Sequence, residues 1–308
     1  MSREHLVREV KGSLKSRVPS AWWRFAKRYA GKRTRAVTLD QIDAVLAEVE
    51  PRGLDGIRSF HLELDDVSLP NDPYSPEYRD AQLALFARIS GRAAYSTALE
   101  HTPIDVAAVP YPYFTRSTQQ VGDQLIAIGH LIKSLGIDPP GRVLEFGPGW
   151  GNTTLALAQT GFDVTAVDVN AQFLELISRR LGPLASRVEC VNADMLGFRP
   201  REPVDAILFF EAFHHCSDPL ALISALPSML KPGGRVLFAS EPIDDFAMPW
   251  GVRLDGESIW AMRKNGWLEL GFETAFFFSA LERAGFHVTR ERSHALTALT
   301  DVIIARRG

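Results

Sequence analysis

One stretch decides the fold of this chain: Val143-Leu144-Glu145-Phe146-Gly147-Pro148-Gly149-Trp150-Gly151-Asn152. A short apolar run of strand character leads into three alternate glycines, and a helical pattern begins at the end of the stretch. Glycine is needed in such a turn because a side chain would block a bound ligand and restrict the backbone dihedrals. The stretch therefore predicts a buried strand that ends in a ligand-binding loop at the start of a helix.

Downstream of this stretch, short β-rich apolar runs alternate with helical segments, which is typical of a parallel sheet covered by helices on both faces. We therefore predict a doubly wound α/β fold. The predicted strands are 143–146, 164–169, 188–191, 206–210, 235–239, 286–291 and 300–305, and the predicted helices between them are 152–160, 171–181, 219–230 and 274–284.

The first third of the chain reads as helical and irregular. A capping-box pattern at Thr38 and Gln41 starts a helix that ends near Pro51, and a second helix runs from Ser75-Pro76 to Gly91. A third helix, capped by Ser117 and Gln120, ends at Gly136 after a proline-rich loop over 101–116. We predict a basic arm with a helical extension over 1–116, and a main domain over 117–308 with an insertion at about 241–271.

The composition predicts a cytoplasmic globular protein. Hydrophobic residues make up 46%, yet no apolar run reaches membrane-spanning length, and two cysteines, Cys190 and Cys216, do not suggest a disulfide framework. Residues 1–35 carry eleven Lys and Arg against Glu4 and Glu9, while the whole chain has a net charge of -3. This arm suits peripheral contact with the inner membrane face or a protein partner, or it is a solvated tail. The acidic remainder argues against nucleic acid as a partner.

A carboxylate follows the glycine loop at the distance that a nucleoside site requires. Asp168 ends the second predicted strand, where it can accept hydrogen bonds from both hydroxyls of a ribose. A dinucleotide fingerprint would need glycine at position 152, where this chain has Asn152. The glycine loop and the acidic residue together therefore favour a nucleoside cofactor that is not a nicotinamide dinucleotide.

The pattern E-x-G-x-G-x-G, followed by an acidic residue at the end of strand two, resembles the signature of class I S-adenosylmethionine-dependent methyltransferases. The later L-K-P-G-G of 230–234 is also similar to this family. The resemblance covers about 117–307 and implies a mostly parallel seven-stranded sheet with S-adenosylmethionine as cofactor. The cofactor-binding residues that it implies are Glu145, Gly147, Gly149, Gly151, Asp168, Val169, Asp194, Met195 and Glu211.

The segment after strand four is the predicted catalytic edge, because ligands of open α/β sheets bind beyond the carboxyl ends of the strands. It lacks the N-P-P-Y or D-P-P-Y of many base and amide methyltransferases. The spacing of His214 and Asp218 is similar to small-molecule O-methyltransferases with a histidine base, so we predict His214 or His215 as the general base. Asp218 also suits a helix N-cap before Pro219. Because the segment lacks the separated ligand pairs of structural zinc, we expect no metal.

The insertion carries Trp250, Trp260 and Trp267 among charged residues. These rings suit either an acceptor pocket or packing against the N-terminal helices. The segments 255–260 and 266–272 are loosely similar to bacterial methyltransferases that accompany glycosyltransferases. The predicted function is methyl transfer to a hydroxyl of a small molecule or glycan. The alternatives are a nicotinamide-dependent oxidoreductase and a non-catalytic S-adenosylmethionine-binding scaffold.

Overall fold

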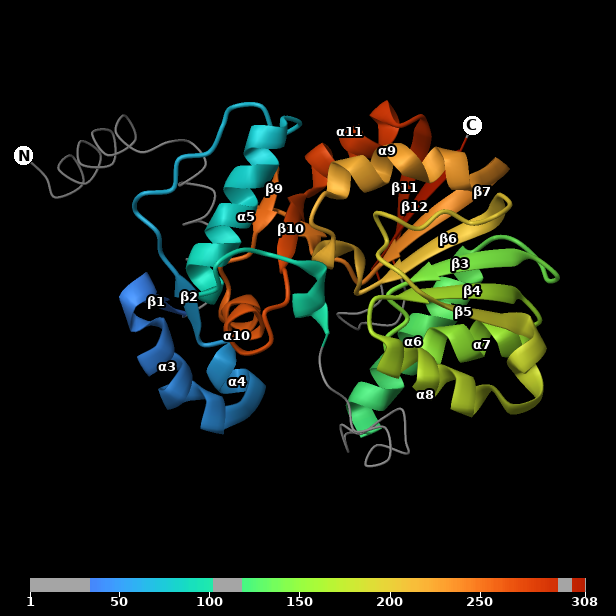
Figure 1. The fold of residues 1–308 in the computed structure, drawn as a ribbon, viewed down its shortest axis with the longest axis horizontal. Coiled ribbons are helices and arrows are strands. Elements are labelled where there is room, and N and C mark those ends of the chain that lie inside the picture. Colours follow the sequence, from blue (N-terminus) through green and yellow to red (C-terminus); the bar gives the residue numbers. More distant parts are fainter. Residues whose placement is uncertain (1–33, 102–117, 293–300, 308) are drawn as a thin grey trace, which may run out of the picture.

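The computed structural model describes residues 34–101, 118–292 and 301–307, and its centre is a seven-stranded sheet (Figure 1). The strand order is β11-β12-β7-β6-β3-β4-β5, in which β3 to β7 are parallel and β12 runs antiparallel to both of its neighbours. The predicted doubly wound sheet is confirmed. Its strands are β3 (Arg142–Phe146), β4 (Asp163–Asp168), β5 (Val188–Asn192), β6 (Val204–Phe210), β7 (Leu230–Ala239), β11 (Phe286–Arg292) and β12 (Asp301–Arg307).

Helices cover both faces of this sheet. One face carries α6 (Thr118–Ser134), α7 (Asn152–Thr160) and α8 (Ala171–Leu181), and the other carries α9 (Pro219–Met229) and α11 (Thr274–Arg283) (Figure 1). Side-chain caps fix three of these helix starts, because Asn170 accepts from the backbone N–H of Gln172, Asp218 from that of Ala221 and Glu273 from that of Phe276. Asp218 thus has the N-cap role that the sequence suggested.

Strand β7 differs from its prediction because it begins at Leu230 rather than at Arg235. Residues Lys231 to Gly234 therefore lie within the strand. The ammonium group of Lys231 lies 2.8 Å from both carboxylate oxygens of Asp205, so this segment is tied to the start of β6. Its position supports a structural role.

The N-terminal extension is less purely helical than the sequence predicted. Its helices are α3 (Ile42–Val49), α4 (Gly53–Ile57) and α5 (Pro76–Ser90), and two parallel strands accompany them, β1 (Arg35–Val37) and β2 (Phe60–Leu62). Strands of three residues are too short to show a periodic pattern, so only tertiary pairing reveals them. Residues 1–33 and 102–117, which hold most of the basic arm and the proline-rich loop, lie outside the described residues.

The extension packs on the insertion, which contains β8 (Ile243–Asp244), β9 (Trp250–Val252), α10 (Gly256–Lys264) and β10 (Leu270–Glu273) (Figure 1). The Trp250 indole N–H donates to the carbonyl of Pro73 at 2.9 Å, and the Trp260 indole N–H donates to Glu50 at 3.1 Å. Two of the three tryptophans therefore serve packing between extension and insertion. The division of the chain near residue 117 stays a prediction.

The described part of the chain contains no helix that is both long and apolar enough to span a membrane.

We predict that Gly256→Ala destabilises the contact between extension and insertion. A Cβ atom at Gly256 would lie 2.0 Å from the carbonyl oxygen of Ile57 and 2.9 Å from the Phe60 ring, so backbone must shift. The expected loss is about 1–3 kcal/mol in the free energy of unfolding, measured by denaturant titration. The control is Gly122→Ala, because a Cβ there meets nothing within 4 Å and should not destabilise helix α6. Equal stability of the two variants would contradict this account of the contact.

Candidate active site

A cavity of about 390 Å³ opens at the carboxyl ends of the central strands, where the extension and the insertion approach the sheet. Eight of the predicted site residues line it, namely Gly147, Gly149, Asp168, Val169, Asp194, Met195, Glu211 and His215. Three others, Glu145, Gly151 and His214, do not. The structure thus places most of the predicted site around one pocket, with a few of its members behind the walls.

The three glycines of the loop have separate physical roles. All have left-handed φ angles, of +64° at Gly147, +50° at Gly149 and +73° at Gly151. A Cβ atom at Gly149 would meet nothing within 4 Å, whereas one at Gly147 would lie 2.6 Å from Ala212 and one at Gly151 would lie 2.3 Å from Ile177. Gly149 therefore leaves open space beside the cavity. The other two glycines permit close packing of the loop against the turn after β6 and against α8.

Asp168 presents a buried carboxylate to the same cavity. Its two oxygens accept from the backbone N–H of Gly149 at 3.3 Å and from that of Asn170 at 2.8 Å. Burial raises the pKa of Asp168, against the effect of these two donors. A nucleoside ribose placed in the open space beside Gly149 would find its hydrogen-bond acceptor here, so the residues present fit such a cofactor.

Glu145 has a different surrounding from the predicted one. Its side chain is buried and accepts a hydrogen bond from the hydroxyl of Thr154 at 2.5 Å, and burial raises its pKa to about 7. It does not line the cavity, so in this structure it braces strand β3 against helix α7. The predicted contact of Glu145 with the cofactor stays a prediction.

The turn after β6 is held by a carboxylate that the sequence analysis did not single out. Glu241 accepts from the backbone N–H groups of Ala212 and Phe213, each at 2.8 Å, and its second oxygen lies 2.7 Å from Nδ1 of His214. Within the described ranges, two non-glycine residues have left-handed φ angles, Glu211 and Ser240. Glu211 directly precedes Ala212 at the start of the turn, and Ser240 directly precedes Glu241. Such backbone is unfavourable by about 1–3 kcal/mol per residue, so the contacts of Glu241 must hold it in place.

The two neighbouring histidines differ in electrostatic state. Burial works against the charge of His214, but the Glu241 carboxylate, with help from Glu269, outweighs it and raises the pKa of His214. Burial and the neighbouring His214 lower the pKa of His215 well below its usual range. The ring centroids lie 4.2 Å apart. Of the two, His214 lies behind the wall with a raised pKa, while His215 lines the cavity with a lowered pKa that favours its neutral imidazole.

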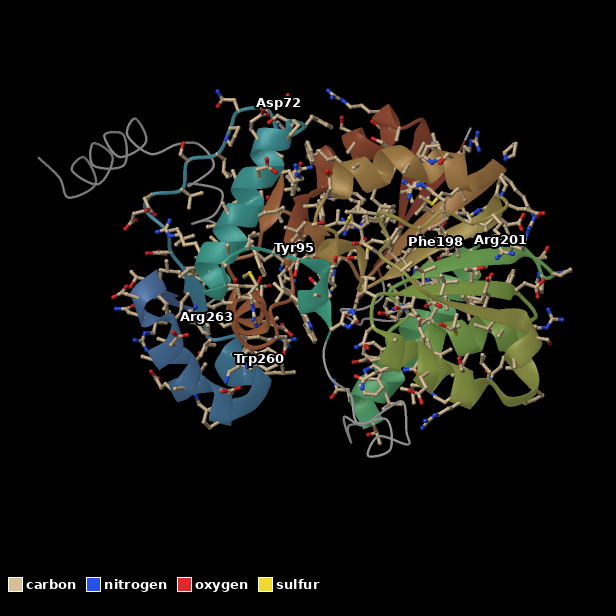
Figure 2. All side chains as sticks on the ribbon, viewed as in Figure 1. Asp72, Tyr95, Phe198, Arg201, Trp260 and Arg263 are labelled. Atoms are coloured by element: carbon tan, nitrogen blue, oxygen red, sulfur yellow. The ribbon has the colours of Figure 1, made fainter. Side chains whose placement is uncertain are left out.

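Several lining residues come from elements that the sequence analysis did not connect with the site. Tyr95 and the 3₁₀ helix η3 (Thr97–Glu100) belong to the extension, and Tyr95 lies between the extension and the sheet (Figure 2). Trp267 comes from the insertion, so the third tryptophan lines the pocket. No local motif marks these residues. Tyr95 is separated from its contact at His215 by 120 positions, and only the folded chain shows their proximity.

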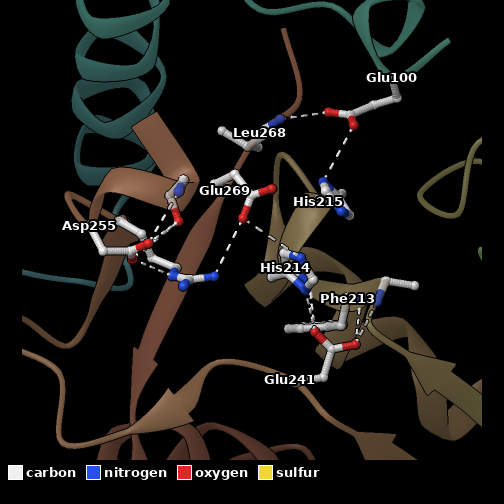
Figure 3. Close-up of polar contacts among 11 residues, drawn as sticks. Glu100, Phe213, His214, His215, Glu241, Asp255, Leu268 and Glu269 are labelled. Atoms are coloured by element: carbon white, nitrogen blue, oxygen red, sulfur yellow. Dashed lines mark hydrogen bonds and ion pairs between the residues drawn. The ribbon is translucent and has the colours of Figure 1, made fainter. Parts of the chain in front are cut away.

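Glu100 and Glu269 bring carboxyl groups to the histidine pair (Figure 3). Oε1 of Glu100 accepts from the backbone N–H of Leu268 at 2.9 Å, and its Oε2 lies 3.4 Å from Nδ1 of His215. Glu269 lies 3.9 Å from Nε2 of His214 and 3.4 Å from the guanidinium of Arg253. One side-chain nitrogen or oxygen atom of each of His214, His215 and Glu269 lies within 4.8 Å of the other two.

Comparison with known proteins identifies the main domain. The family model described as "Methyltransferase domain" matches residues 122–291, which is more than half of the chain. The chain belongs to the class I S-adenosylmethionine-dependent methyltransferases. S-adenosylmethionine is therefore the cofactor of this fold, and the residues around Gly149 and Asp168 would hold it.

Curated relatives of this methyltransferase match over about a third of its length. A ubiquinone biosynthesis O-methyltransferase of Xylella fastidiosa is 39% identical over 105 residues, which are 32% of this chain and 41% of the relative. An uncharacterized methyltransferase of Geobacillus kaustophilus is 33% identical over 106 residues, which are 33% of this chain and 48% of the relative. The chain thus spans less than half the length of these relatives.

Solved methyltransferase structures are similar at low identity. The 1,6-didemethyltoxoflavin-N1-methyltransferase of Burkholderia thailandensis has a TM-score of 0.47 at 19% identity, covering 66% of this chain and 86% of that one. An S-adenosylmethionine-dependent methyltransferase of Mesorhizobium loti has a TM-score of 0.47 at 18% identity, covering 59% and 98%.

We predict that Gly149→Arg abolishes binding of S-adenosylhomocysteine because the new side chain occupies the open space beside Asp168. Calorimetric titration measures the effect, with an expected loss of at least about 100-fold in affinity. Gly182→Arg is a matched control, since Gly182 has the same φ of +50°, also has nothing within 4 Å of a Cβ, and lies outside the cavity. Wild-type affinity in a folded Gly149→Arg protein would overturn this placement of the cofactor.

Proposed function

We propose that the chain transfers a methyl group from S-adenosylmethionine to a hydroxyl of a small molecule or glycan, giving S-adenosylhomocysteine. The observation that carries the proposal is the position of His215, a neutral imidazole in the wall of the same cavity that Gly149 and Asp168 line. When bound, the cofactor supplies an electrophilic methyl group on its sulfonium. The protein must supply the orientation of the acceptor and the removal of its proton.

Removal of the proton is the step that the histidines support. A hydroxyl is a weak nucleophile until a base takes its proton, and an uncharged imidazole can do so. Both His214 and His215 were predicted for this role, and the geometry favours His215 as the base. His214 is buried, its Nδ1 is bound to Glu241, and it does not line the cavity. We therefore propose that His214 holds the neighbouring His215 in position.

The lining of the outer cavity supports a hydroxylated acceptor. Trp267 offers an aromatic face, and Thr97 and Ser217 offer hydroxyl groups that can both donate and accept hydrogen bonds. The name of the Xylella fastidiosa relative, an O-methyltransferase, also supports oxygen as the accepting atom. Tyr95 and Glu100, which precede the family-matched region, supply part of this wall, so the acceptor can differ from that of the relative.

The remaining alternatives are distinguishable by simple binding and transfer assays. The family match, together with Asn152 in place of a third fingerprint glycine, argues against a nicotinamide-dependent oxidoreductase. A scaffold protein would bind S-adenosylhomocysteine and transfer no methyl group. Screening hydroxylated acceptors and cell extracts with ¹³C-methyl S-adenosylmethionine, and locating the label by NMR, separates transfer to oxygen from transfer to nitrogen or from none. Label on nitrogen or carbon alone would refute the proposal.

We predict that His215→Ala lowers methyl turnover by roughly 10²–10⁴-fold, the usual contribution of a general base, and leaves the affinity for S-adenosylhomocysteine nearly unchanged. Because a protonated ring cannot accept the proton, protonation of His215 itself would limit turnover only below the lowered pKa of its ring. The control is His130→Ala on helix α6, a half-buried histidine that does not line the cavity, and this variant should behave like the wild type. Near-normal turnover in His215→Ala would exclude this base.

A further inference from the structure

Glu100 connects three parts of the molecule at the acceptor side of the cavity. It ends the 3₁₀ helix of the extension, binds the backbone of Leu268 in the insertion, and faces His215 on the turn after β6 (Figure 3). Its side chain is 10% exposed. The 3.4 Å between Oε2 of Glu100 and Nδ1 of His215 is within reach of a hydrogen bond that tightens when an acceptor binds.

The position of the proton on a neutral imidazole depends on this contact. Nδ1 of His215 is buried and lies 3.4 Å from Oε2 of Glu100, and a hydrogen bond to the backbone of Leu268 also acts on this imidazole. With Nδ1 on the side of Glu100, an acceptor in the cavity would meet Nε2. If Nδ1 carries the proton and donates it to a carboxylate, Nε2 keeps its lone pair and can act as a base. If the proton sits on Nε2, the ring cannot take a proton from the acceptor.

The geometry points to Glu100 as the positioning residue that fixes the proton of His215 on Nδ1 and thereby makes Nε2 the base. This inference rests on the proposed function, because it assigns how the proposed base is prepared. Oε1 of Glu100 is already engaged by the N–H of Leu268, so Oε2 is the oxygen available to His215. The extension would then contribute directly to the chemistry of the methyltransferase site.

The charge state of Glu100 makes the arrangement sensitive to pH. Burial raises the pKa of Glu100 to about 8, and the N–H of Leu268 and the hydroxyl of Tyr95 oppose that rise. The other charged or titratable groups near the pair are His214, Glu269, Arg253 and Cys216. Below about pH 8 a protonated Glu100 donates to Nδ1 and leaves the imidazole proton on Nε2. Above it the carboxylate accepts from Nδ1–H, so turnover should rise as the pH increases through about 8.

The test is Glu100→Gln, which keeps the size and the acceptor for Leu268 N–H but offers an amide NH₂ to Nδ1 of His215. The protonated nitrogen of His215 is read by ¹⁵N NMR of histidine-labelled full-length protein with S-adenosylhomocysteine bound, from about pH 6 to about pH 10. We expect the wild-type proton to move from Nε2 to Nδ1 near pH 8 and to stay on Nε2 throughout in Glu100→Gln. If the same nitrogen of His215 carries the proton at every pH and in both proteins, the inference is wrong.

Turnover gives a second readout, with the hydroxylated acceptor found in the ¹³C-methyl screen as substrate. In Glu100→Gln, turnover should fall by roughly 10²-fold or more, and the rise of turnover with pH near 8 should disappear. Unchanged affinity for S-adenosylhomocysteine would show that the variant is folded. Glu77→Gln, an exposed change on α5, is the matched control. Unchanged turnover and pH profile in Glu100→Gln, with His215→Ala inactive, would refute only this inference. Failure of the wild type to methylate oxygen would refute the proposed function instead.

Discussion

Glu241 accepts hydrogen bonds from the backbone N–H groups of Ala212 and Phe213, and its second oxygen receives Nδ1–H of His214. This side chain is wholly buried. A buried carboxylate is stable only when donors surround it, and here those donors belong to the turn that follows β6. The turn cannot relax its left-handed residue Glu211 without breaking these bonds. The turn carries His215, and its Ala212 packs against Gly147 of the glycine loop. The positions of His215 and of the glycine loop at the pocket therefore both depend on the carboxylate of Glu241.

The pocket is lined on one side by the central sheet and its glycine loop, and on the other side by the extension and the insertion. The sheet and its glycine loop provide the open space beside Gly149 and the carboxylate of Asp168. The extension and the insertion provide the outer wall, including Glu100 and Trp267. These two segments pack on each other through buried contacts such as the hydrogen bond from the Tyr78 hydroxyl to the carbonyl of Trp250.

The sequence predicted well those features that depend on neighbouring residues, such as helix ends and the glycine loop. The helices at 152–160 and 171–181 have the predicted bounds, because glycine and asparagine signals mark their ends, and the glycine loop with Asp168 lies at the pocket as expected. Tyr95 and Glu100 were missed because only tertiary packing brings the extension to the sheet. His214 and His215 are adjacent in sequence, so no pattern tells which ring faces the cavity; the turn fixed by Glu241 decides it. The short strands β1 and β2 escaped prediction because they are stabilised by pairing with each other and by the contact of β2 with Leu254 and Asp255, which are distant in the sequence.

Amide hydrogen exchange at Ala212 and Phe213 tests most directly whether Glu241 holds the site together. The measurement compares the wild type with Glu241→Gln, both with S-adenosylhomocysteine bound, and needs no known acceptor. If the carboxylate anchors the turn, the substitution should accelerate exchange of these amides about 10-fold or more, since each 1.4 kcal/mol of lost local stability is a factor of ten. Amides in strands β3 and β4 should keep their protection. Unchanged protection of Ala212 and Phe213 in Glu241→Gln would contradict the account.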